Sequence, residues 1–528
     1  AHLLYNDIRC RYIRGYTMGN RHYRKEGYKF ILASLGVTGM LTGCVGNTGS
    51  VTDAGSGPDQ AYVPEIVGTY EAEEAKLSGN VTSESGRTDY SGTGYATGFQ
   101  NDGDSCTFSV TIDEEGFYDL NFLTASSDYK ENYITVDGES LGTIVTDQKD
   151  FNDSVISRVY LTAGSHEVTV SKYWGYIDLD QLIVQTSEPI DPSFYDVSAE
   201  LINPNATDNT KRLMSYLTDN YGTNILSGQY SQDGMNGREF AVIKKETGKT
   251  PAVLGLDLIE YSPSRVANGS KSMATQAAIG YWKQGGIVTF CWHWNAPEKY
   301  LTGNWYSGFY NDSTNIDLAK IMNGEDPEGY DLLMEDIDAI AQQLLILQDE
   351  GVPILWRPLH EASGGWFWWG ASGPEAYKQL YILLYDKLTN EYGLNNLIWV
   401  WNGQDAEWYP GDEYVDIIGE DIYPGEHVYT SQVNKYLEAA DYTSAKKMVV
   451  LSENGCVFDP ELAKRDGAMW GFWCTWGSEF VAKDVMVYTY SDQYTETDKL
   501  KEFYDNEIVI TQDELPDLTS YPIREELQ

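Results

Sequence analysis

Residues 331–361 read DLLMEDIDAIAQQLLILQDEGVPILWRPLHE, and this stretch decides the fold. Its first part, 331–351, has the recurring apolar residues of a helix. Its second part, 352–361, is a continuous apolar run, which is typical of a strand buried on both faces and hence of a parallel sheet. The run ends on two polar side chains, His360 and Glu361. The stretch therefore predicts a helix–strand unit of an α/β domain, with chemistry at the carboxyl end of the strand.

The same combination of apolar run and helix-like stretch recurs through the C-terminal part of the chain. The apolar runs are NILSGQY (224–230), PAVLGLDL (251–258), GIVTFCWHW (286–294), VPILWRPLHE (352–361), NLIWVWNG (396–403), VDIIGEDIY (415–423), KMVVLSENG (447–455) and WGFWCTWG (470–477). Another helix-like stretch covers 374–393. Strand–helix units repeated in this way predict a (β/α)8 TIM barrel, which we place at 188–515. A doubly wound open sheet is the alternative, but the Gly-rich phosphate turn that usually follows its first strand is missing.

Polar or aromatic side chains stand at the end of every one of these runs. They are Gln229, Asp257, His293, His360, Glu361, Asn402, Asp421, Tyr423, Glu453, Asn454 and Trp476. In a TIM barrel all strands end on the same face, where active sites form. The convergence of so many reactive side chains predicts that the active site lies at this face.

Two glutamates of this set, Glu361 and Glu453, are the candidate catalytic pair. Hydrolysis of a glycosidic bond uses one protonated carboxyl group and one ionised carboxylate. The two residues end the fourth and seventh strands, which face each other across the barrel mouth, so the separation of about 5–5.5 Å found in retaining enzymes is feasible. The acid needs a raised pKa, which a neighbouring carboxylate and desolvating Trp side chains supply. The ionised partner needs hydrogen-bond donors, for which Tyr423, His293 and Arg357 are candidates.

Two motifs around the acid carry a specific resemblance to a known family. The sequence reads WRPLHE at 356–361 and GGWFWWG at 364–370, and from about 210 to 490 the chain resembles glycoside hydrolase family 26, which is dominated by retaining β-mannanases. The resemblance implies that Glu361 is the acid/base, that Glu453 in LSENG is the nucleophile, and that catalysis needs no cofactor. It also implies substrate-binding roles for His293, His360, Trp366, Asp421, Tyr423 and Trp476.

The activity implied by the resemblance is a retaining endo-β-1,4-mannanase that cuts mannan-type plant polysaccharides by double displacement. The residues after the acid, Ala362-Ser363, differ from the Met-Asn that family members often carry. Mixed-linkage β-glucan and xylan therefore stay open as substrates of the same fold and mechanism. A non-catalytic surface glycan-binding protein is a further alternative, but a barrel without catalysis has no reason to keep both glutamates.

Residues 66–187 read as a separate domain of short strands. Alternating runs such as CTFSVTI (106–112) and HEVTVSKY (166–173) are separated by Asp-Gly and Ala-Gly turns. Strands of this length and spacing predict an all-β sandwich of jelly-roll type. The domain opens with YEAE (70–73) and closes with IDLDQLIV (177–184), and in this it resembles carbohydrate-binding module family 35.

This second resemblance implies a structural calcium ion, because members of that family bind calcium between acids of the first and last strands. The corresponding residues here are Glu71, Glu73 and Asp180. Converging carboxylate oxygens need a divalent cation or costly protonation, which agrees with such a site. The resemblance also implies an aromatic sugar platform at a loop edge, with Trp174 as the best candidate and Tyr129 and Tyr90 as lesser ones. Solvated surface charge for the acids and a core position for Trp174 are the alternatives.

The N-terminal part of the chain has the pattern of an export signal. Residues 1–17 precede a start at Met18 and are set aside as an upstream segment. Residues 18–44 contain a basic stretch, an apolar stretch too short to span a bilayer comfortably, and then LTGC. This resembles a bacterial lipoprotein signal and implies a lipid anchor to the membrane at Cys44. Residues 45–65 read as a flexible linker. We therefore expect an exported bacterial protein, either a cell-surface lipoprotein or a secreted one.

The composition of the chain limits the kinds of molecule that it can bind. The net charge of −44 repels phosphate backbones, so nucleic acid is excluded as a partner, whereas a neutral polysaccharide is not repelled. Aromatic residues make up 13% of the chain, which is typical of a folded protein and suits stacking against sugars. We expect a monomer.

The cysteines do not form a disulfide framework in a chain of this length. Cys106, Cys291, Cys456 and Cys474 show no metal-ligand spacing and are expected to be small buried hydrophobic residues. A bridge between Cys456 and Cys474 stays open if their strands are neighbours.

Overall fold

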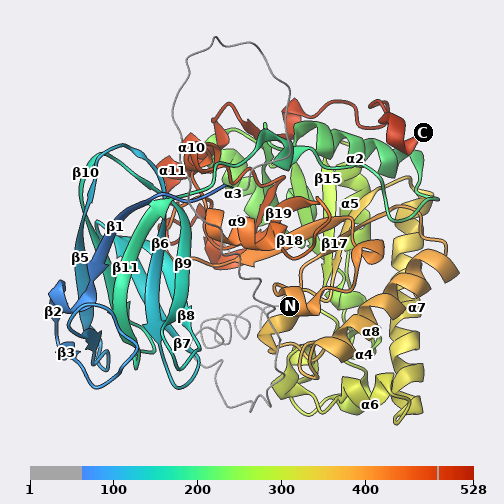
Figure 1. Ribbon diagram of the computed structural model, residues 1–528. Helices are drawn as coiled ribbons and strands as arrows, with labels where there is room; N and C mark the ends of the chain where they lie inside the picture. Colours follow the sequence, from blue (N-terminus) through green and yellow to red (C-terminus); the bar gives the residue numbers. More distant parts are fainter. Residues whose placement is uncertain (1–61, 485–486) are drawn as a thin grey trace, which may run out of the picture.

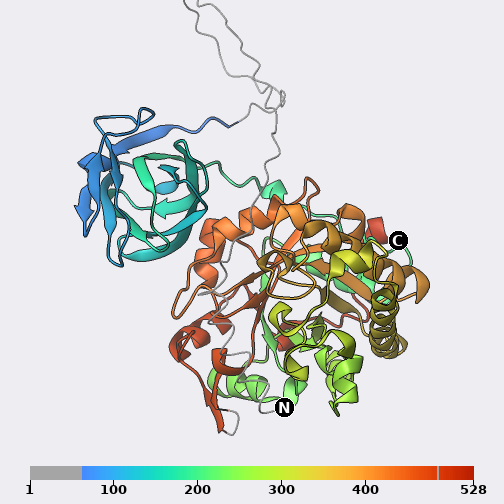
Figure 2. The same cartoon turned by 90° about the horizontal axis from the view of Figure 1, so that it is seen from below.

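The computed structural model describes residues 62–484 and 487–528. The predicted upstream segment, the export signal with Cys44 and most of the linker lie outside these residues. The described chain forms a β-sandwich and a larger barrel domain, which lie side by side (Figures 1 and 2). Within the described ranges, no helix is long and apolar enough to cross a membrane.

The first part is a sandwich of two antiparallel sheets. One sheet has the order β3-β4-β11-β6-β9, with β1 paired to β11, and the other has the order β2-β5-β10-β7-β8. The strands are β1 (Ile66–Glu71), β2 (Lys76–Ser78), β3 (Thr82–Glu84), β4 (Tyr95–Thr97), β5 (Ser105–Ile112), β6 (Gly116–Ala125), β7 (Lys130–Val136), β8 (Glu139–Thr146), β9 (Asn152–Leu161), β10 (Gly164–Lys172) and β11 (Asp178–Thr186). In β5 every second residue from Cys106 to Ile112 is buried, because the inner faces of the two sheets pack together as the core.

The β-sandwich predicted from the sequence is confirmed. The alternating runs that the sequence shows become β5, β6, β7, β9, β10 and β11. The sequence pattern does not single out β2, β3 and β4, which have only three residues each, or β8, where polar residues and Gly142 interrupt the apolar alternation.

The second part contains a closed barrel of eight strands, which run parallel in sequence order. The strands are β13 (Gly228–Tyr230), β14 (Val253–Asp257), β15 (Ile287–Trp292), β16 (Ile354–Pro358), β17 (Leu397–Trp401), β18 (Ile417–Ile422), β19 (Met448–Asn454) and β20 (Trp473–Thr475). Each apolar run of the sequence contains one of them, so the TIM barrel is confirmed and the open-sheet alternative is wrong. Every residue of β14, β15, β16 and β17 is buried, because the barrel interior covers one face and the helices cover the other.

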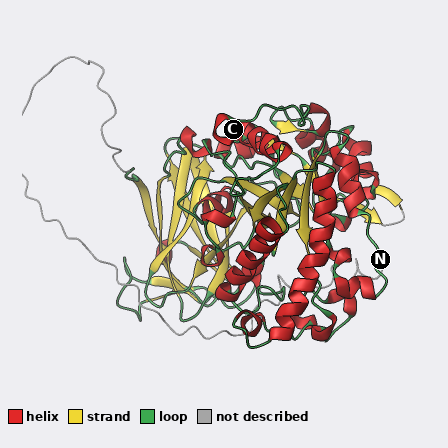
Figure 3. Ribbon diagram, turned by 90° about the vertical axis from the view of Figure 1, so that its right-hand side faces the viewer, coloured by secondary structure: helices red, strands yellow, loops and turns green. Residues whose placement is uncertain are grey.

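Helices surround the barrel strands, as Figure 3 shows. They are α2 (Asp208–Asn220), α3 (Arg238–Thr247), α4 (Pro263–Ala267), α5 (Ala274–Trp282), α6 (Leu318–Met322), α7 (Pro327–Asp349), α8 (Pro374–Tyr385), α9 (Val433–Ala440), α10 (Pro460–Asp466) and α11 (Thr497–Tyr504). The predicted helix at 331–351 begins earlier, at Pro327, because the side chain of Asp326 caps the first turn. The predicted helix at 374–393 is formed by α8 and a π-helical turn that follows it.

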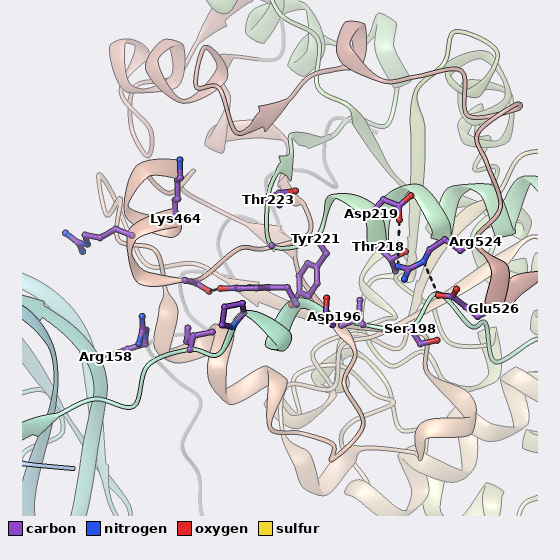
Figure 4. Close-up of a pocket in the computed structure, with 17 residues that line it drawn as sticks. Arg158, Asp196, Ser198, Thr218, Asp219, Tyr221, Thr223, Lys464, Arg524 and Glu526 are labelled. Carbon is purple, nitrogen blue, oxygen red and sulfur yellow. Dashed lines mark hydrogen bonds and ion pairs between the residues drawn. The ribbon is translucent and has the colours of Figure 1, made fainter. Parts of the chain in front are cut away.

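The sandwich contacts the barrel domain through Arg158 of β9. The Nε atom of Arg158 donates to the carbonyl oxygen of Asp466 at 2.8 Å, and its Nη1 donates to that of Glu188 at 3.1 Å. The guanidinium also lies 4.2 Å from the ring centroid of Phe117. A groove of about 940 Å³ opens beside this contact (Figure 4). It is lined by Arg158, by Lys464, by residues of the connector, which is the segment after β11 that joins the two domains, and by residues of α2. None of the site residues predicted from the sequence lines this groove.

The four cysteines within the described residues are buried and form no disulfide. The bridge between Cys456 and Cys474 that the sequence left open is therefore wrong. The thiol of Cys456 donates instead to the carbonyl oxygen of Tyr494 at 3.1 Å, whereas Cys474 lies in the barrel wall in β20.

Candidate active site

Two glutamates meet at the carboxyl ends of the barrel strands. Glu361 follows β16 and Glu453 lies near the end of β19. One carboxylate oxygen of each of Glu361, Asp421 and Glu453 lies within 4.8 Å of the others. All three residues are buried. The two candidate catalytic carboxyl groups are therefore close enough to act on the same sugar carbon, at a spacing that suits retention rather than inversion.

The carboxylate of Glu453 accepts hydrogen bonds from two side chains. Arg357 donates from Nη2 to Oε2 of Glu453 at 2.6 Å, and the hydroxyl of Tyr423 donates to Oε1. Burial raises the pKa of Tyr423 well above its usual value, and the neighbouring carboxylates raise it further, so the phenol keeps its proton and remains a donor. Donors to both oxygens favour the ionised form of a carboxylate, which a nucleophile requires.

Arg357 is the central cation of the site. Its Nη1 atom pairs with Asp421, and its Nη2 atom donates to Glu453 and to the hydroxyl of Tyr230 at 3.1 Å. Burial by itself would lower the pKa of Arg357, but Asp421, Tyr230 and Glu453 raise it well above its usual value, so the guanidinium stays charged. Burial raises the pKa of Asp421, and the nearby glutamates add to this while Arg357 opposes it. Because Glu361 lies close to these two acids and the guanidinium pairs only with Asp421 and Glu453, the cluster favours the retention of a proton.

Glu361 sits in a tight turn with unusual backbone geometry. Both Leu359 and Glu361 have left-handed backbone conformations, with φ of 53° and 55°. The backbone N–H of Glu361 donates to the carbonyl oxygen of Asn402 at 2.7 Å, which joins the turn to the end of β17. The Nε1 atom of Trp366 donates to Oε2 of Glu361 at 2.9 Å. Gly364 lies against this indole. A Cβ at this position would come within 2.0 Å of the ring, so the close contact requires a glycine.

Trp366 and Trp476 provide the aromatic surfaces of the site. Trp366 is 38% exposed, so its ring is open to a ligand beside Glu361. Trp476 is partly buried, with ring-centroid distances of 4.7 Å to Tyr230 and 5.7 Å to His293. Both positions agree with the platform role that the sequence resemblance implies, since indole faces suit sugar C–H groups.

The other aromatic residues of the 364–370 motif are core. Phe367, Trp368 and Trp369 are almost completely buried. The ring of Phe367 stacks on that of Trp369, and the indole N–H of Trp368 donates to the carbonyl oxygen of Trp294 at 2.6 Å. All three rings therefore pack in the core of the loop and do not face the substrate.

His293 and His360 lie side by side next to the catalytic pair. Nε2 of His293 is 3.2 Å from Nε2 of His360, and Nδ1 of His293 is 2.7 Å from Oδ2 of Asp257. The suggestion that His293 donates to Glu453 is wrong, because both of its ring nitrogens are engaged elsewhere. Burial lowers the pKa of His360 well below its usual value, and the charge of Arg357 lowers it further.

Asp421 was expected to contact substrate, but its side chain is fully buried. It accepts hydrogen bonds from Arg357 and, at 2.8 Å, from the hydroxyl of Ser452. The structure therefore makes it a buried anchor for Arg357. Tyr230 was missed for a related reason. The sequence pointed to Gln229, but the side chain of Gln229 donates to backbone carbonyls around β20. Tyr230 is the next residue, so its side chain lies on the other face of the strand, where it contacts Arg357.

Two groups of described residues bring three potential metal ligands together. One is the set formed by Glu361, Asp421 and Glu453, and the other is formed by Asp257, Cys291 and His293. In the first group the guanidinium of Arg357 already neutralises part of the charge. In the second group a hydrogen bond to Asp257 already occupies Nδ1 of His293. Hydrogen bonding therefore accounts for both arrangements.

The predicted acids of the sandwich gather around one turn, residues 91–94. The hydroxyl of Ser91 donates to Glu71 at 2.6 Å and to Asp180 at 3.2 Å, and the backbone N–H of Thr93 donates to Glu73 at 2.6 Å. Burial raises the pKa of Asp180, with additional contributions from the charges of the two glutamates.

Trp174 lies on the same domain, in an aromatic cluster at the surface. Its ring centroid is 5.6 Å from that of Tyr129 and 6.3 Å from that of Tyr173. Trp174 is partly exposed and Tyr129 is 47% exposed, so a core position for Trp174 is wrong.

Comparisons with known proteins agree with both domains. Residues 202–514 match glycosyl hydrolase family 26, and residues 68–187 match carbohydrate binding module family 35. A mannan endo-1,4-β-mannosidase of Thermothelomyces thermophilus is 39% identical over 85% of this chain and 90% of its own length. A mannan endo-1,4-β-mannosidase B of Piromyces sp. is 38% identical over 85% of this chain and 77% of its own length.

Solved structures match this chain over most of its length. A Podospora anserina β-(1,4)-mannanase with domains of these two families superposes with a TM-score of 0.60 at 38% identity, over 86% of this chain and 99% of that one. A ruminal family 26 endo-β-1,4-mannanase superposes with a TM-score of 0.63 at 30% identity, over 87% of this chain and 99% of that one.

Proposed function

Because this chain belongs to glycosyl hydrolase family 26, we propose that it is a retaining endo-β-1,4-mannanase that cuts mannan-type plant polysaccharides by double displacement. The observation that carries the proposal is the close approach of the Glu361 and Glu453 carboxylates at the barrel mouth. Relatives that span most of this chain are named as mannan endo-1,4-β-mannosidases, which supports mannan as the substrate.

The hydrogen bonds around the two glutamates suggest which one takes which role. Glu453 accepts from Arg357 and Tyr423, which hold its carboxylate in place, so it attacks the anomeric carbon. Glu361 delivers a proton to the glycosidic oxygen as the leaving sugar departs. In the second half-reaction the same carboxylate removes a proton from water, which then displaces Glu453 from the sugar. Catalysis in this mechanism needs no cofactor.

The surfaces around the pair suit a neutral sugar chain. Trp366 is open beside Glu361, and Trp476 lies near His293, so both rings are placed to pack against sugar C–H faces. The strongly negative chain does not repel an uncharged polysaccharide. Mixed-linkage β-glucan and xylan are the alternative substrates, because Ala362 and Ser363 differ from the common family motif.

The test is the release of reducing ends from linear and galactose-branched mannans, with mixed-linkage β-glucan and xylan assayed in parallel. Glu453→Ala and Glu361→Ala should release less than about a thousandth of the wild-type amount. Both variants should still bind mannan in a pull-down assay. Glu375→Gln, at an exposed position on α8, is the matched control and should keep full activity. Wild-type rates in Glu453→Ala would exclude the mechanism, and binding without cleavage by the wild type would identify a non-catalytic glycan-binding protein.

We propose that the sandwich domain is a carbohydrate-binding module that holds a structural calcium ion through Glu71, Glu73 and Asp180. The donor set suits calcium, since all three ligands are hard carboxylate oxygens and Oε2 of Glu73 is buried without a hydrogen-bond partner. A chelator should lower the melting temperature of the full chain, and added calcium should restore it. An unchanged melting curve would reject the site.

We propose that Trp174 is the sugar platform of this module. The ring is partly exposed next to Tyr129, which supports a stacking surface. The test is retention on insoluble mannan by the full chain with Glu453→Ala, to prevent cleavage. Adding Trp174→Ala should reduce retention several-fold, while Tyr488→Ala, at an exposed position of the barrel domain, should not. Equal retention would reject this platform.

We propose that the protein is exported and lipid-anchored at Cys44, and that it acts as a monomer. The basic and apolar stretches followed by LTGC support this processing. Radiolabelled palmitate should be incorporated by cells that express the wild type and not by cells that express Cys44→Ser. Light scattering on the soluble enzyme should give the mass of one chain.

A further inference from the structure

Asp257, His293 and His360 form a hydrogen-bonded chain next to the catalytic pair. They come from three adjacent barrel strands, at the ends of β14, β15 and β16. Oδ2 of Asp257 is 2.7 Å from Nδ1 of His293, and Nε2 of His293 is 3.2 Å from Nε2 of His360. All three residues are buried, so water does not compete for these contacts.

The carboxylate of Asp257 has only one available orientation. Its Oδ1 atom accepts from the backbone N–H of Ile259 at 2.8 Å and from that of His293 at 3.1 Å. Its Oδ2 atom is therefore the one that faces the imidazole. An ionised carboxylate can only accept hydrogen bonds, so Nδ1 of His293 must carry a proton.

This proton determines the state of the second histidine. A neutral His293 with its proton on Nδ1 has a lone pair on Nε2, so the Nε2–H of His360 must donate to it. Nδ1 of His360 then has no proton. That atom is buried and has no hydrogen-bond partner, and an N–H in its place would be buried without an acceptor, which destabilises the folded protein. The depressed pKa of His360 keeps its ring neutral, in agreement with this arrangement.

His360 stands between two residues with strained backbone conformations. Leu359 and Glu361 both have positive φ, and a non-glycine residue in this region is strained. Such a turn persists only if its surroundings hold it. The hydrogen bond to His293 fixes the ring of His360. The backbone carbonyl oxygen of His360 accepts a hydrogen bond from Nε1 of Trp369 at 2.9 Å.

We propose that Asp257 is a positioning residue of this active site, which sets the protonation form of His293 and through it that of His360, and so holds the turn that presents Glu361. The proposal rests on the function proposed above, in which Glu361 is the acid/base. Asp257 does not touch the substrate, and its influence passes through two imidazole rings.

Asp257→Asn is the decisive variant because the two side chains have almost the same shape. The backbone donors of Ile259 and His293 hold the amide oxygen in the place of Oδ1, which turns the NH2 group toward Nδ1 of His293. That nitrogen must then accept, so the proton of His293 moves to Nε2. His293 now donates to His360, whose own proton moves to Nδ1, where no acceptor lies. One substitution thus reverses both tautomers while each ring keeps one proton.

The tautomers can be read directly by nitrogen NMR of the enzyme labelled at histidine. The chain has six histidines, and His293→Gln and His360→Gln identify the two signals of interest. The wild type should show His293 protonated at Nδ1 and His360 protonated at Nε2, and Asp257→Asn should show the reverse. A wild-type His360 with its proton on Nδ1 would overturn the proposal, whether or not the variant folds.

Kinetics separate positioning from general damage. Asp257→Asn should lower kcat on mannohexaose at least about 100-fold, as an isosteric change at a His-orienting Asp does in other enzymes, with KM changed less than about 3-fold. In a His360→Gln background the same change should cost less than about 3-fold, because the chain is already broken. Asp257→Asn with wild-type kcat, or with an undiminished loss in that background, would overturn the proposal. Inactivity of the wild type on every glycan would overturn the proposed function, while the expected tautomers would still support the chain.

Discussion

Arg357 donates a hydrogen bond from Nη2 to Oε2 of Glu453 at 2.6 Å, and both side chains are buried at the barrel mouth. The other terminal nitrogen of the same guanidinium binds Asp421. A planar guanidinium can hold two carboxylates at fixed positions, whereas an ammonium group acts as a point charge. The position of the Glu453 carboxylate therefore depends on the geometry of Arg357 as well as on its charge.

Arg357→Lys should lower kcat/KM at least about 100-fold, because lysine keeps the charge but cannot bridge Asp421 and Glu453 together. The melting temperature should also fall, since one buried carboxylate loses its partner. Steady-state kinetics on mannohexaose and thermal melting measure the two effects. Arg524→Lys, at a partly exposed ion pair with Glu526, is the control and should leave kcat/KM unchanged. An Arg357→Lys enzyme with wild-type kcat/KM would contradict the bridging role.

Trp366→Phe and Trp366→Ala should separate the two functions of this side chain. Phenylalanine keeps an aromatic face but lacks the N–H that donates to Glu361 at 2.9 Å, so kcat should fall about 10-fold with little change in KM. Alanine also removes the face that packs on sugar, so KM should rise several-fold as well. Comparable kcat and KM in the two variants would show that the indole N–H has no separate role.

The sequence predicted the barrel and the close approach of Glu361 and Glu453 because both follow from strand geometry. Continuous apolar runs mark strands that are buried on both faces, and their last residues meet at one rim. Glu361 and Glu453 could be found in this way. The resemblance to family 26 then assigned a role to each residue, and the structure supplies the separation of the carboxylates and the partners of each.

The partners of the site residues could not be predicted, because they depend on which neighbour each side chain reaches across the barrel. His293 binds Asp257 and His360 instead of Glu453, and Asp421 is buried under Arg357 instead of lining the cleft. Tyr230 reaches the site where Gln229 was expected. A difference of one position along a strand reverses the direction of a side chain, and a sequence pattern does not fix it to that precision.

Asp336→Asn should stabilise the protein at alkaline pH. Asp336 is buried in α7, where it accepts a hydrogen bond from Nε1 of Trp294 at 2.7 Å, and burial raises its pKa to about 7. The folded state therefore keeps a proton that the unfolded state loses near pH 4. The resulting cost to stability grows as the pH rises from about 4 to about 7 and is constant above that. Asparagine can accept the same hydrogen bond and carries no charge.

The measurement is urea unfolding of the wild type and Asp336→Asn at pH 5 and pH 8. The stability difference in favour of the variant should widen by about 3 kcal/mol between the two pH values, since each unit of pKa shift corresponds to about 1.4 kcal/mol. Asp331→Asn removes an exposed carboxylate of the same helix and should show no such widening. A difference that stays constant or narrows with rising pH would mean that Asp336 is not protonated in the folded protein near neutrality.

Arg158→Ala should loosen the attachment of the sandwich to the barrel domain. Arg158 donates to the carbonyl oxygens of Asp466 and Glu188, and its guanidinium lies over Phe117. Alanine leaves two carbonyl oxygens without their donor and loosens the packing between the two domains. A protease should therefore cut the connector around 188–191 at least several-fold faster. The radius of gyration from X-ray scattering should also rise. Cleavage of mannohexaose should not change, because Arg158 lies away from the catalytic pair.

Arg87→Ala removes an arginine whose contacts stay within the sandwich and serves as the control. If Arg158→Ala and Arg87→Ala are cut at the same rate as the wild type, Arg158 does not hold the two domains together.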